Sequence, residues 1–157
     1  MAWNKEKNIR DASCWLADKV KLIELKEYQK NNNIQTNIFR GGIFNVDLGS
    51  GNIGGEKNKI RPCIVLSRTT LNVGDTVVVV PLTTKFPFNM TNGKKTPKYK
   101  NHYVVHKSKY TFLKDDSCIK FEDIRSIDKV RIKNLIGNLD NSDLKSLEKR
   151  LTFTMGF

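Results

Sequence analysis

The first 36 residues carry an apolar pattern with helical spacing. Between residues 6 and 30, apolar side chains recur every three or four positions, and this face comprises Ile9, Ala12, Leu16, Val20 and Ile23, with Trp15 beside it. The polar stretch NNNIQTN then ends the pattern. The sequence therefore predicts one long helix. Its apolar face needs a cover, and we expect it to pack on the chain's own domain, with a second subunit or a partner as alternatives.

After residue 37 the pattern changes to short apolar runs that are typical of strands. The predicted strands are NIFRGGIFNVDL, PCIVLS, DTVVVVPL, HYVVH and SCIKFEDIRSI. The stretch FPFNMTNGKKTPKYKN is rich in Pro, Gly, Asn and Lys, and we predict a loop there.

The end of the chain, LDNSDLKSLEKRLTF, returns to helical spacing. Leu144, Leu147 and Leu151 share one face, and the Asp, Asn or Ser at 140–142 can cap the helix. A helix, a set of strands and a closing helix predict an α+β domain built around a small sheet or barrel.

Composition excludes several classes of protein. With 157 residues, 38% hydrophobic and 28% charged, the chain fits one domain with an appendage and is neither disordered nor membrane-embedded. The start, MAWNKEKNIRD, lacks the apolar core of a signal peptide, and we expect a cytoplasmic protein with no membrane segment. Cys14, Cys63 and Cys118 are scattered and form no CxxC pair, which indicates reduced thiols. We predict no metal and no other cofactor.

Charge is the strongest compositional signal. The chain has 28 Lys and Arg against 16 Asp and Glu, a net charge of +12. No acidic residue lies between Asp75 and Asp115, where eight lysines fall. Such a one-sided charge favours a polyanionic partner, either nucleic acid or an acidic protein. A lysine-rich surface that serves only solubility is the open alternative.

Four segments in a fixed order resemble a known family. RGGIFNVDL, NIGGEKNKIRPCIVLS, DTVVVVPLTT and DDSCIKFEDIRSIDKVRI are similar, in that order, to the MazF/PemK toxins of bacterial toxin-antitoxin systems. The similarity covers residues 38 to about 155. It divides the chain into an N-terminal helical extension, residues 1–36, and a MazF/PemK-like toxin domain, residues 37–157.

The resemblance implies a fold and an activity. Members of the family fold as a small SH3-like barrel of the plasmid-maintenance-toxin type with peripheral helices, and they form homodimers. They are metal-independent endoribonucleases that cleave single-stranded RNA at short sequences, and a cognate antitoxin inhibits them. The resemblance implies that Arg61 and Thr83 are catalytic and that Glu56 is linked to activity. The family often has a carboxylate where this chain has Gly42.

The chemistry fits these residue types. Metal-free cleavage uses the ribose 2'-hydroxyl as nucleophile, and a planar guanidinium such as that of Arg61 can hold the phosphate with two parallel hydrogen bonds. A guanidinium with a pKa above about 12 is a poor base, so the base stays open, with Glu56 as the nearest candidate in sequence. Strand alternation puts Thr83 and Thr84 on opposite faces, so only one of them can face the site.

The basic segment from Lys85 to Asn101 is the predicted substrate arm. It mixes lysines with aromatic rings, which suits a single-stranded RNA with unstacked bases. Residues near Arg61 are expected to form the other wall of the groove. The predicted RNA-binding residues are Lys57, Asn58, Lys59, Ser67, Thr84, Lys85, Phe86, Lys94 and Lys95, with Asn72 as a further polar candidate.

Other interpretations stay open. Arg61, Thr83 and Glu56 each fit an ordinary surface or strand position as well. His102 and His106 share a side if both lie in one strand and can then act as base and acid, although surface positions are more common. Two other functions also fit: a non-catalytic toxin of the same fold that binds a protein such as DNA gyrase, and a silent RNA-binding module.

Overall fold

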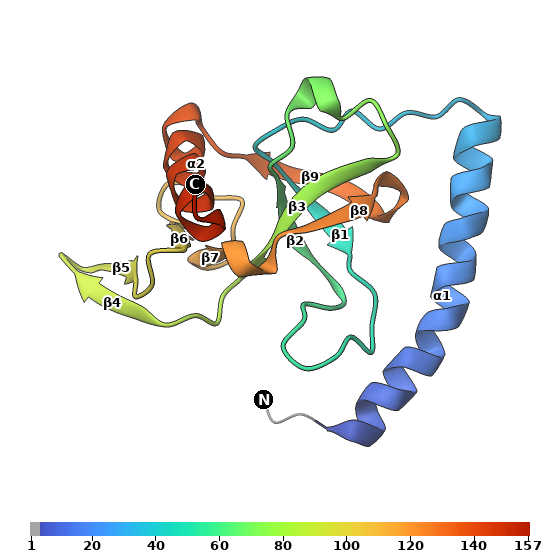
Figure 1. Cartoon of the computed structure of the whole chain (residues 1–157), viewed down its shortest axis with the longest axis horizontal. Helices are drawn as coiled ribbons and strands as arrows, with labels where there is room; N and C mark the ends of the chain where they lie inside the picture. The colour runs from blue at the N-terminus through green and yellow to red at the C-terminus, as the bar shows by residue number, and fades with distance from the viewer. Residues whose placement is uncertain (1–3) are drawn as a thin grey trace.

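The structure is a computed structural model that describes residues 4–157. Within these residues a helix lies at each end of the chain and nine strands lie between them (Figure 1). The elements are α1 (Lys5–Asn31), β1 (Gly42–Asp47), β2 (Ile60–Val65), β3 (Thr76–Thr83), β4 (Phe88–Thr91), β5 (Lys94–Pro97), β6 (His102–Val105), β7 (Ser117–Lys120), β8 (Arg125–Asp128), β9 (Ile132–Asn138) and α2 (Asn141–Met155). Neither of the two helices described here is long and apolar enough to cross a membrane.

Seven strands form one sheet in the order β6-β7-β3-β2-β1-β9, with β8 paired to β3 as well. All of its strand pairs are antiparallel. This arrangement confirms the predicted α+β class. Pairing among the described strands leaves β6 and β9 unjoined, so the predicted barrel is not fully closed.

Alternate residues of the central strands fill two apolar clusters. In β2, Ile64 packs in one cluster with Val80 of β3, and helix α2 covers that cluster through Leu147. Cys63 packs in the other cluster with Val79. The period of two along these strands therefore separates two cores and fixes which side chains share a face.

Helix α1 packs through a different side from the predicted one. Leu22 is buried, and Trp15 and Lys26 are half-buried. The large side chains of the predicted apolar face stay exposed to solvent, with exposed fractions of 57% for Ile9, 66% for Leu16, 46% for Val20 and 60% for Ile23, whereas Ala12 of that face lies against Gly51. The expectation that these large apolar side chains pack on the domain was wrong. The side of the helix that carries Trp15, Leu22 and Lys26 makes the contact instead.

The predicted loop at residues 86–101 contains a hairpin, β4 and β5. Its turn is Asn92 and Gly93, with φ of 49° and 72°. Two consecutive positive φ angles define the tight turn that Asn-Gly favours, so the loop prediction was wrong at a position where the sequence carried the signal. The hairpin stands away from the main sheet (Figure 1).

The predicted strand SCIKFEDIRSI is in fact two strands. A single 3-10 turn, Phe121–Asp123, separates β7 from β8, and both strands pair with β3. Phe121 is fully buried in the core and anchors the turn. Glu122 and Asp123 therefore project from a fixed position beside β3.

Helix α2 is confirmed, and a polar network fastens it to the sheet. Asp140 caps the helix by accepting a hydrogen bond from the Asp143 backbone at 2.9 Å. The carboxylate of Asp143 accepts hydrogen bonds from the hydroxyl groups of Tyr103 at 2.8 Å and Tyr110 at 2.6 Å. The Lys109 ammonium lies 3.0 Å from it. The network joins β6, the segment after it and α2.

Candidate active site

Arg61 and Thr83 lie at the same edge of the sheet. Strands β2 and β3 pair as far as Cys63 opposite Pro81, and Arg61 and Thr83 each lie two residues beyond that last pair, on the same face as it. Residues directly opposite in an antiparallel pair point to the same face and lie about 5 Å apart at their Cβ atoms. Both side chains are half-buried. The structure thus places two of the predicted catalytic residues at one edge of the sheet, where β2 begins and β3 ends.

The Arg61 side chain is held at its base. Its Nε donates a hydrogen bond to the Asn58 carbonyl at 2.9 Å. The two terminal nitrogens make no hydrogen bond within residues 4–157, so they can serve as a fork for an oxyanion. Pro62, which restricts the backbone of Arg61 to an extended conformation, adds to this preorganisation.

A second arginine, Arg125, shares this face and was not predicted. It begins β8 opposite Val79 of β3, and its Nη1 donates to the Lys57 carbonyl at 3.4 Å. Burial raises the pKa of the Cys63 thiol to about 12, and the positive charges of Arg61 and Arg125 both oppose that rise. Arg125 lies opposite Val79, which packs in the same apolar cluster as Cys63, and Arg61 is two residues before Cys63 in β2, so the register places both guanidinium groups on one side of the sheet.

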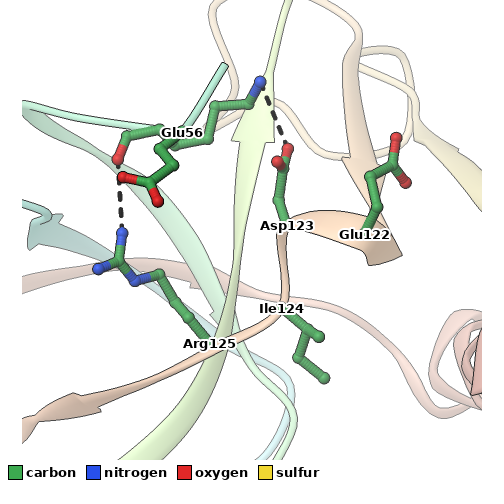
Figure 2. A pocket seen from close by; sticks show the side chains of 6 residues that line it. Glu56, Glu122, Asp123, Ile124 and Arg125 are labelled. Carbon is green, nitrogen blue, oxygen red and sulfur yellow. Dashed lines mark hydrogen bonds and ion pairs between the residues drawn. The ribbon is translucent and has the colours of Figure 1, made fainter. Parts of the chain in front are cut away.

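Arg125 also lines a pocket of about 310 Å³ beside these strands (Figure 2). Its walls come from the β1–β2 loop, the 3-10 turn and the start of β8, through Glu56, Lys57, Glu122, Asp123, Ile124 and Arg125. Lys57 Nζ lies 3.4 Å from Asp123 Oδ2, and both residues line the pocket. The pocket therefore offers both hydrogen-bond donors and acceptors.

The two histidines do not form an acid–base pair. His102 is 2% exposed, which corrects the expected surface position, and its Nε2 donates to Glu122 Oε1 at 2.8 Å. Partial burial is the largest single effect and raises the pKa of Glu122, but the hydrogen bond from His102, a backbone hydrogen bond and the charges of His102 and Lys120 together lower that pKa below its ordinary value. Asn101 donates to Oε2 at 2.7 Å. His106 lies beyond the end of β6, with Nδ1 3.6 Å from Asp116.

Glu56 is the least constrained carboxylate of the pocket. It is exposed, and its Oε2 accepts one hydrogen bond from the Ile53 backbone at 3.3 Å. Glu122 is held by two side-chain donors and Asp123 by an ion pair. Of the three, Glu56 is the one whose lone pairs are most available to a substrate proton.

Several predicted RNA-binding residues lie near Arg61. Lys57, Asn58 and Lys59 come directly before it in the β1–β2 loop, and Asn52 fixes Lys57 by donating to its carbonyl at 2.7 Å. Thr84 and Lys85 follow Thr83 and are exposed. The Thr83 hydroxyl accepts a hydrogen bond from the Lys85 backbone at 3.3 Å.

The structure does not bring Ser67, Asn72 or Phe86 to the site. Ser67 lies just past the far end of β2 and accepts a hydrogen bond from the Val78 backbone. It is six residues from Arg61, which is roughly 20 Å along an extended strand. Asn72 is buried and donates to the Ile38 carbonyl at 3.3 Å. Phe86 is 9% exposed and packs against Val104 and Cys118. These side chains support the fold and do not offer a surface to RNA.

Lys94 and Lys95 lie on β5 of the projecting hairpin. Lys95 Nζ sits 5.1 Å from the ring centre of Phe88, whose exposed fraction is 43%. Phe88 therefore takes the place of Phe86 as the aromatic ring available to stack on a base.

Close packing explains why position 42 is a glycine. A Cβ atom at this position would lie 2.6 Å from the Phe44 ring and 3.1 Å from the Phe39 ring. In β1 it is Val46 that pairs with Arg61, so Gly42 lies four residues, roughly 13 Å, from the catalytic edge. A side chain at this position would therefore have to displace the Phe44 ring, and the position lies away from Arg61.

Comparison with known proteins identifies the family of the chain. Residues 39–155 match the family described as "PemK-like, MazF-like toxin of type II toxin-antitoxin system". The chain is 31% identical over 118 residues to Endoribonuclease MazF of Staphylococcus saprophyticus, which covers 74% of this chain and 90% of that protein.

Solved structures share the fold. MazF from Deinococcus radiodurans superposes with a TM-score of 0.59 at 17% identity, covering 78% of this chain and 100% of that one. An endoribonuclease from a mycobacterial species, in complex with its cognate antitoxin, gives a TM-score of 0.56 at 17% identity, covering 76% of this chain and 96% of that one.

Proposed function

The chain belongs to the PemK-like, MazF-like toxin family of type II toxin-antitoxin systems, and from this premise we propose that it is an endoribonuclease that cuts single-stranded RNA and is inhibited by a cognate antitoxin. The observation that carries the proposal is the convergence of Arg61, Thr83 and Arg125 on one face of the sheet, beside a pocket.

The proposed reaction needs no metal. The 2'-oxygen bonds to phosphorus while the bond from phosphorus to the 5'-oxygen breaks, which leaves a 2',3'-cyclic phosphate and a 5'-hydroxyl. The proton of the 2'-hydroxyl leaves to a base, and the departing 5'-oxygen takes up a proton. Arg61 stabilises the charge that develops on the non-bridging oxygens, and the Thr83 hydroxyl donates one more hydrogen bond.

We assign the base to Glu56. It is the carboxylate of the pocket with the fewest partners, and its loop leads directly into Arg61. Arg125 from β8 and Lys57, next to Glu56 in the loop, supply positive charge, which favours binding of an RNA phosphate next to the one that is cut. Glu122 and Asp123 can accept hydrogen bonds from base N–H groups and so contribute to sequence preference.

The partners follow from the same charges. The net charge of +12 suits an RNA strand and also an acidic antitoxin segment, which would compete for the same surface. We further propose that the toxin acts in the cytoplasm as a homodimer, and that residues 37–157 form the toxin domain while residues 1–36 form a separate extension. A family match that starts at residue 39 supports this division.

The test is incubation of the purified protein with a long single-stranded RNA in EDTA, followed by mapping of the fragment ends. The wild type is expected to give discrete fragments with cyclic phosphate and 5'-hydroxyl ends. Arg61→Ala is expected to lose about 100-fold to 1,000-fold in rate. Arg68→Ala removes the same charge from an exposed site at the other end of β2 and should cut normally.

Two results contradict this function. RNA that binds but stays intact would favour the silent RNA-binding module. RNA that neither binds nor is cut would favour the toxin that binds a protein target.

A further inference from the structure

Helix α1 lies outside the family match and contacts the loop that leads into the site. The β1–β2 loop, residues 48–59, lies beside the first half of α1 (Figure 1). Ser50 Oγ donates to the Asp11 carbonyl at 2.9 Å. At Gly51, a Cβ atom would lie 2.5 Å from the backbone N and Cα of Ala12. Loop backbone and helix backbone are therefore in direct contact, with no room for a side chain between them.

Trp15 extends this contact to the sheet. Its indole packs against Gly49, where a Cβ atom would lie 3.1 to 3.4 Å from the ring. The Arg131 guanidinium lies 5.3 Å from the centre of the same indole and donates from Nη1 to the Asp47 carbonyl at 3.2 Å. Trp15 thus contacts the loop and an arginine that is itself bonded to the end of β1.

The C-terminal half of α1 is attached to the domain at a second place. Lys26 pairs with Asp128 at the end of β8 and lies 3.4 Å from Asp75. Partial desolvation opposes the shift, but the hydrogen bond to Asp128 raises the pKa of Lys26 above its ordinary value, so the pair is charged at neutral pH. Leu22 is buried between these two attachment regions. Helix α1 is therefore attached at both halves, which keeps Trp15 in place.

The contact continues to Arg61 through backbone hydrogen bonds. The Gly49 carbonyl accepts from the Lys59 amide, and the Lys59 carbonyl accepts from the Leu48 amide at 3.1 Å. Asn58, next to Lys59, holds Arg61 Nε through its carbonyl at 2.9 Å. Residues 48–49, on the side that touches α1, and residues 58–59, on the side that holds Arg61, thus form one short hydrogen-bonded ladder.

We propose that Trp15 and Ala12 are positioning residues: by packing on Gly49 and Gly51, they hold the β1–β2 loop so that Arg61 and Glu56 are aligned for cleavage. The loop carries glycines at positions 49, 51, 54 and 55, so without a support it has many conformations to choose from. The claim that this contact aligns Arg61 and Glu56 for cleavage rests on the proposed function. The claim that the contact orders the β1–β2 loop does not depend on it.

The experiment compares matched variants in the full chain. Gly51→Ala forces the loop away from α1, whereas Gly54→Ala has a similar cost at positive φ, 60° against 72°, with no atom within 4 Å of the new Cβ. Trp15→Ala removes the packing on Gly49, Trp15→Phe keeps a ring there, and Leu16→Ala truncates the exposed neighbour on the same helix. For each variant, kcat and KM on a short single-stranded RNA and the hydrogen exchange of the Leu48 and Lys59 amides are measured.

For Trp15→Ala and Gly51→Ala we expect kcat to fall about 10-fold to 100-fold, because a displacement of about 1 Å costs that much, while KM changes little. The Leu48 and Lys59 amides should exchange about tenfold faster, and the β2–β3 ladder should keep its wild-type rates. Trp15→Phe should restore most of kcat.

Wild-type exchange of the loop amides in Trp15→Ala would overturn the proposal. An equal loss of kcat in Leu16→Ala and Gly54→Ala would overturn it too. The exchange measurement uses no RNA, so a wild-type protein that cuts no RNA would refute the proposed function and leave the exchange comparison to decide the positioning role.

Discussion

Replacing Asp143 by alanine tests the network that fastens α2 to the sheet. Asp143 is 9% exposed and accepts hydrogen bonds from Tyr103 at 2.8 Å and Tyr110 at 2.6 Å. The substitution leaves both hydroxyl groups without their acceptor. Tyr110 is 8% exposed, so water replaces its lost partner poorly, whereas Tyr103 is partly exposed and is solvated more easily.

The magnitude follows from these contacts. A hydrogen bond to a charged acceptor contributes about 1.5 to 3 kcal/mol, and we count Tyr110 near the upper value and Tyr103 near the lower. Lys109 keeps its partner Asp140 at 2.6 Å and its side chain is 45% exposed, so it adds little. Removing the carboxylate also removes the cost of burying its charge, which reduces the sum. We expect the free energy of unfolding to fall by about 3 kcal/mol.

Urea unfolding followed by tryptophan fluorescence measures this change, with an unchanged m value as the check that only stability has moved. Tyr103→Phe, Tyr110→Phe and their combinations with Asp143→Ala give the coupling of each pair. Glu148→Ala is the control on the same helix, because it breaks a surface ion pair with Arg40 worth less than about 1 kcal/mol. A loss in Asp143→Ala no larger than that of Glu148→Ala would refute the reasoning.

The remaining predictions concern the site and its thiol. Arg125→Ala should lower kcat/KM about 10-fold to 100-fold through a lost charge-assisted contact, and an effect no larger than that of Arg68→Ala would remove Arg125 from the site. Because the folded-state pKa of Cys63 is raised from 9.0 to about 12, the unfolded chain loses that proton first, so stability falls as pH rises from 9 to 12. Cys63→Ala should reduce that alkaline slope by about 1.4 kcal/mol per pH unit, and an unchanged slope would contradict the raised pKa. Gly42→Asp should lower the unfolding free energy by about 1 to 3 kcal/mol without raising the cleavage rate, and a faster enzyme would show that this position reaches the site after all.

The elements of the fold followed from sequence where one local rule dominated. The period of three to four predicted both helices, and the apolar runs predicted β2 and β3, because burial of one or both faces sets those patterns directly. The Asn92–Gly93 hairpin was missed because a lysine-rich composition outweighed a turn signal of two residues. The packing side of α1 could not be read from its own residues, since Trp15 and Lys26 find partners that are far away in sequence.

Some residues of the site could likewise be predicted from the sequence, and others could not. Arg61 and Thr83 were predicted together through resemblance, and the antiparallel pairing of β2 and β3 puts the start of one strand and the end of the other at the same edge of the sheet. Arg125 was hidden because it occupies one position of an alternating strand, and only the pairing of β8 with β3 brings it to the same face. Ser67 was misplaced for the converse reason, since it is close to Arg61 in sequence but lies at the far end of β2.

The two arginines impose a cost on the unliganded protein. Both act on the buried Cys63 thiol from the same face, so their like charges repel each other in a region that solvent screens incompletely. Lys57 adds a third positive charge, and its pairing with Asp123 offsets only part of the repulsion. We expect a bound phosphate to reduce this repulsion, and the acidic antitoxin segment proposed above to reduce it as well. We therefore expect binding of either polyanion to stabilise the fold through the positive charges of Arg61, Arg125 and Lys57.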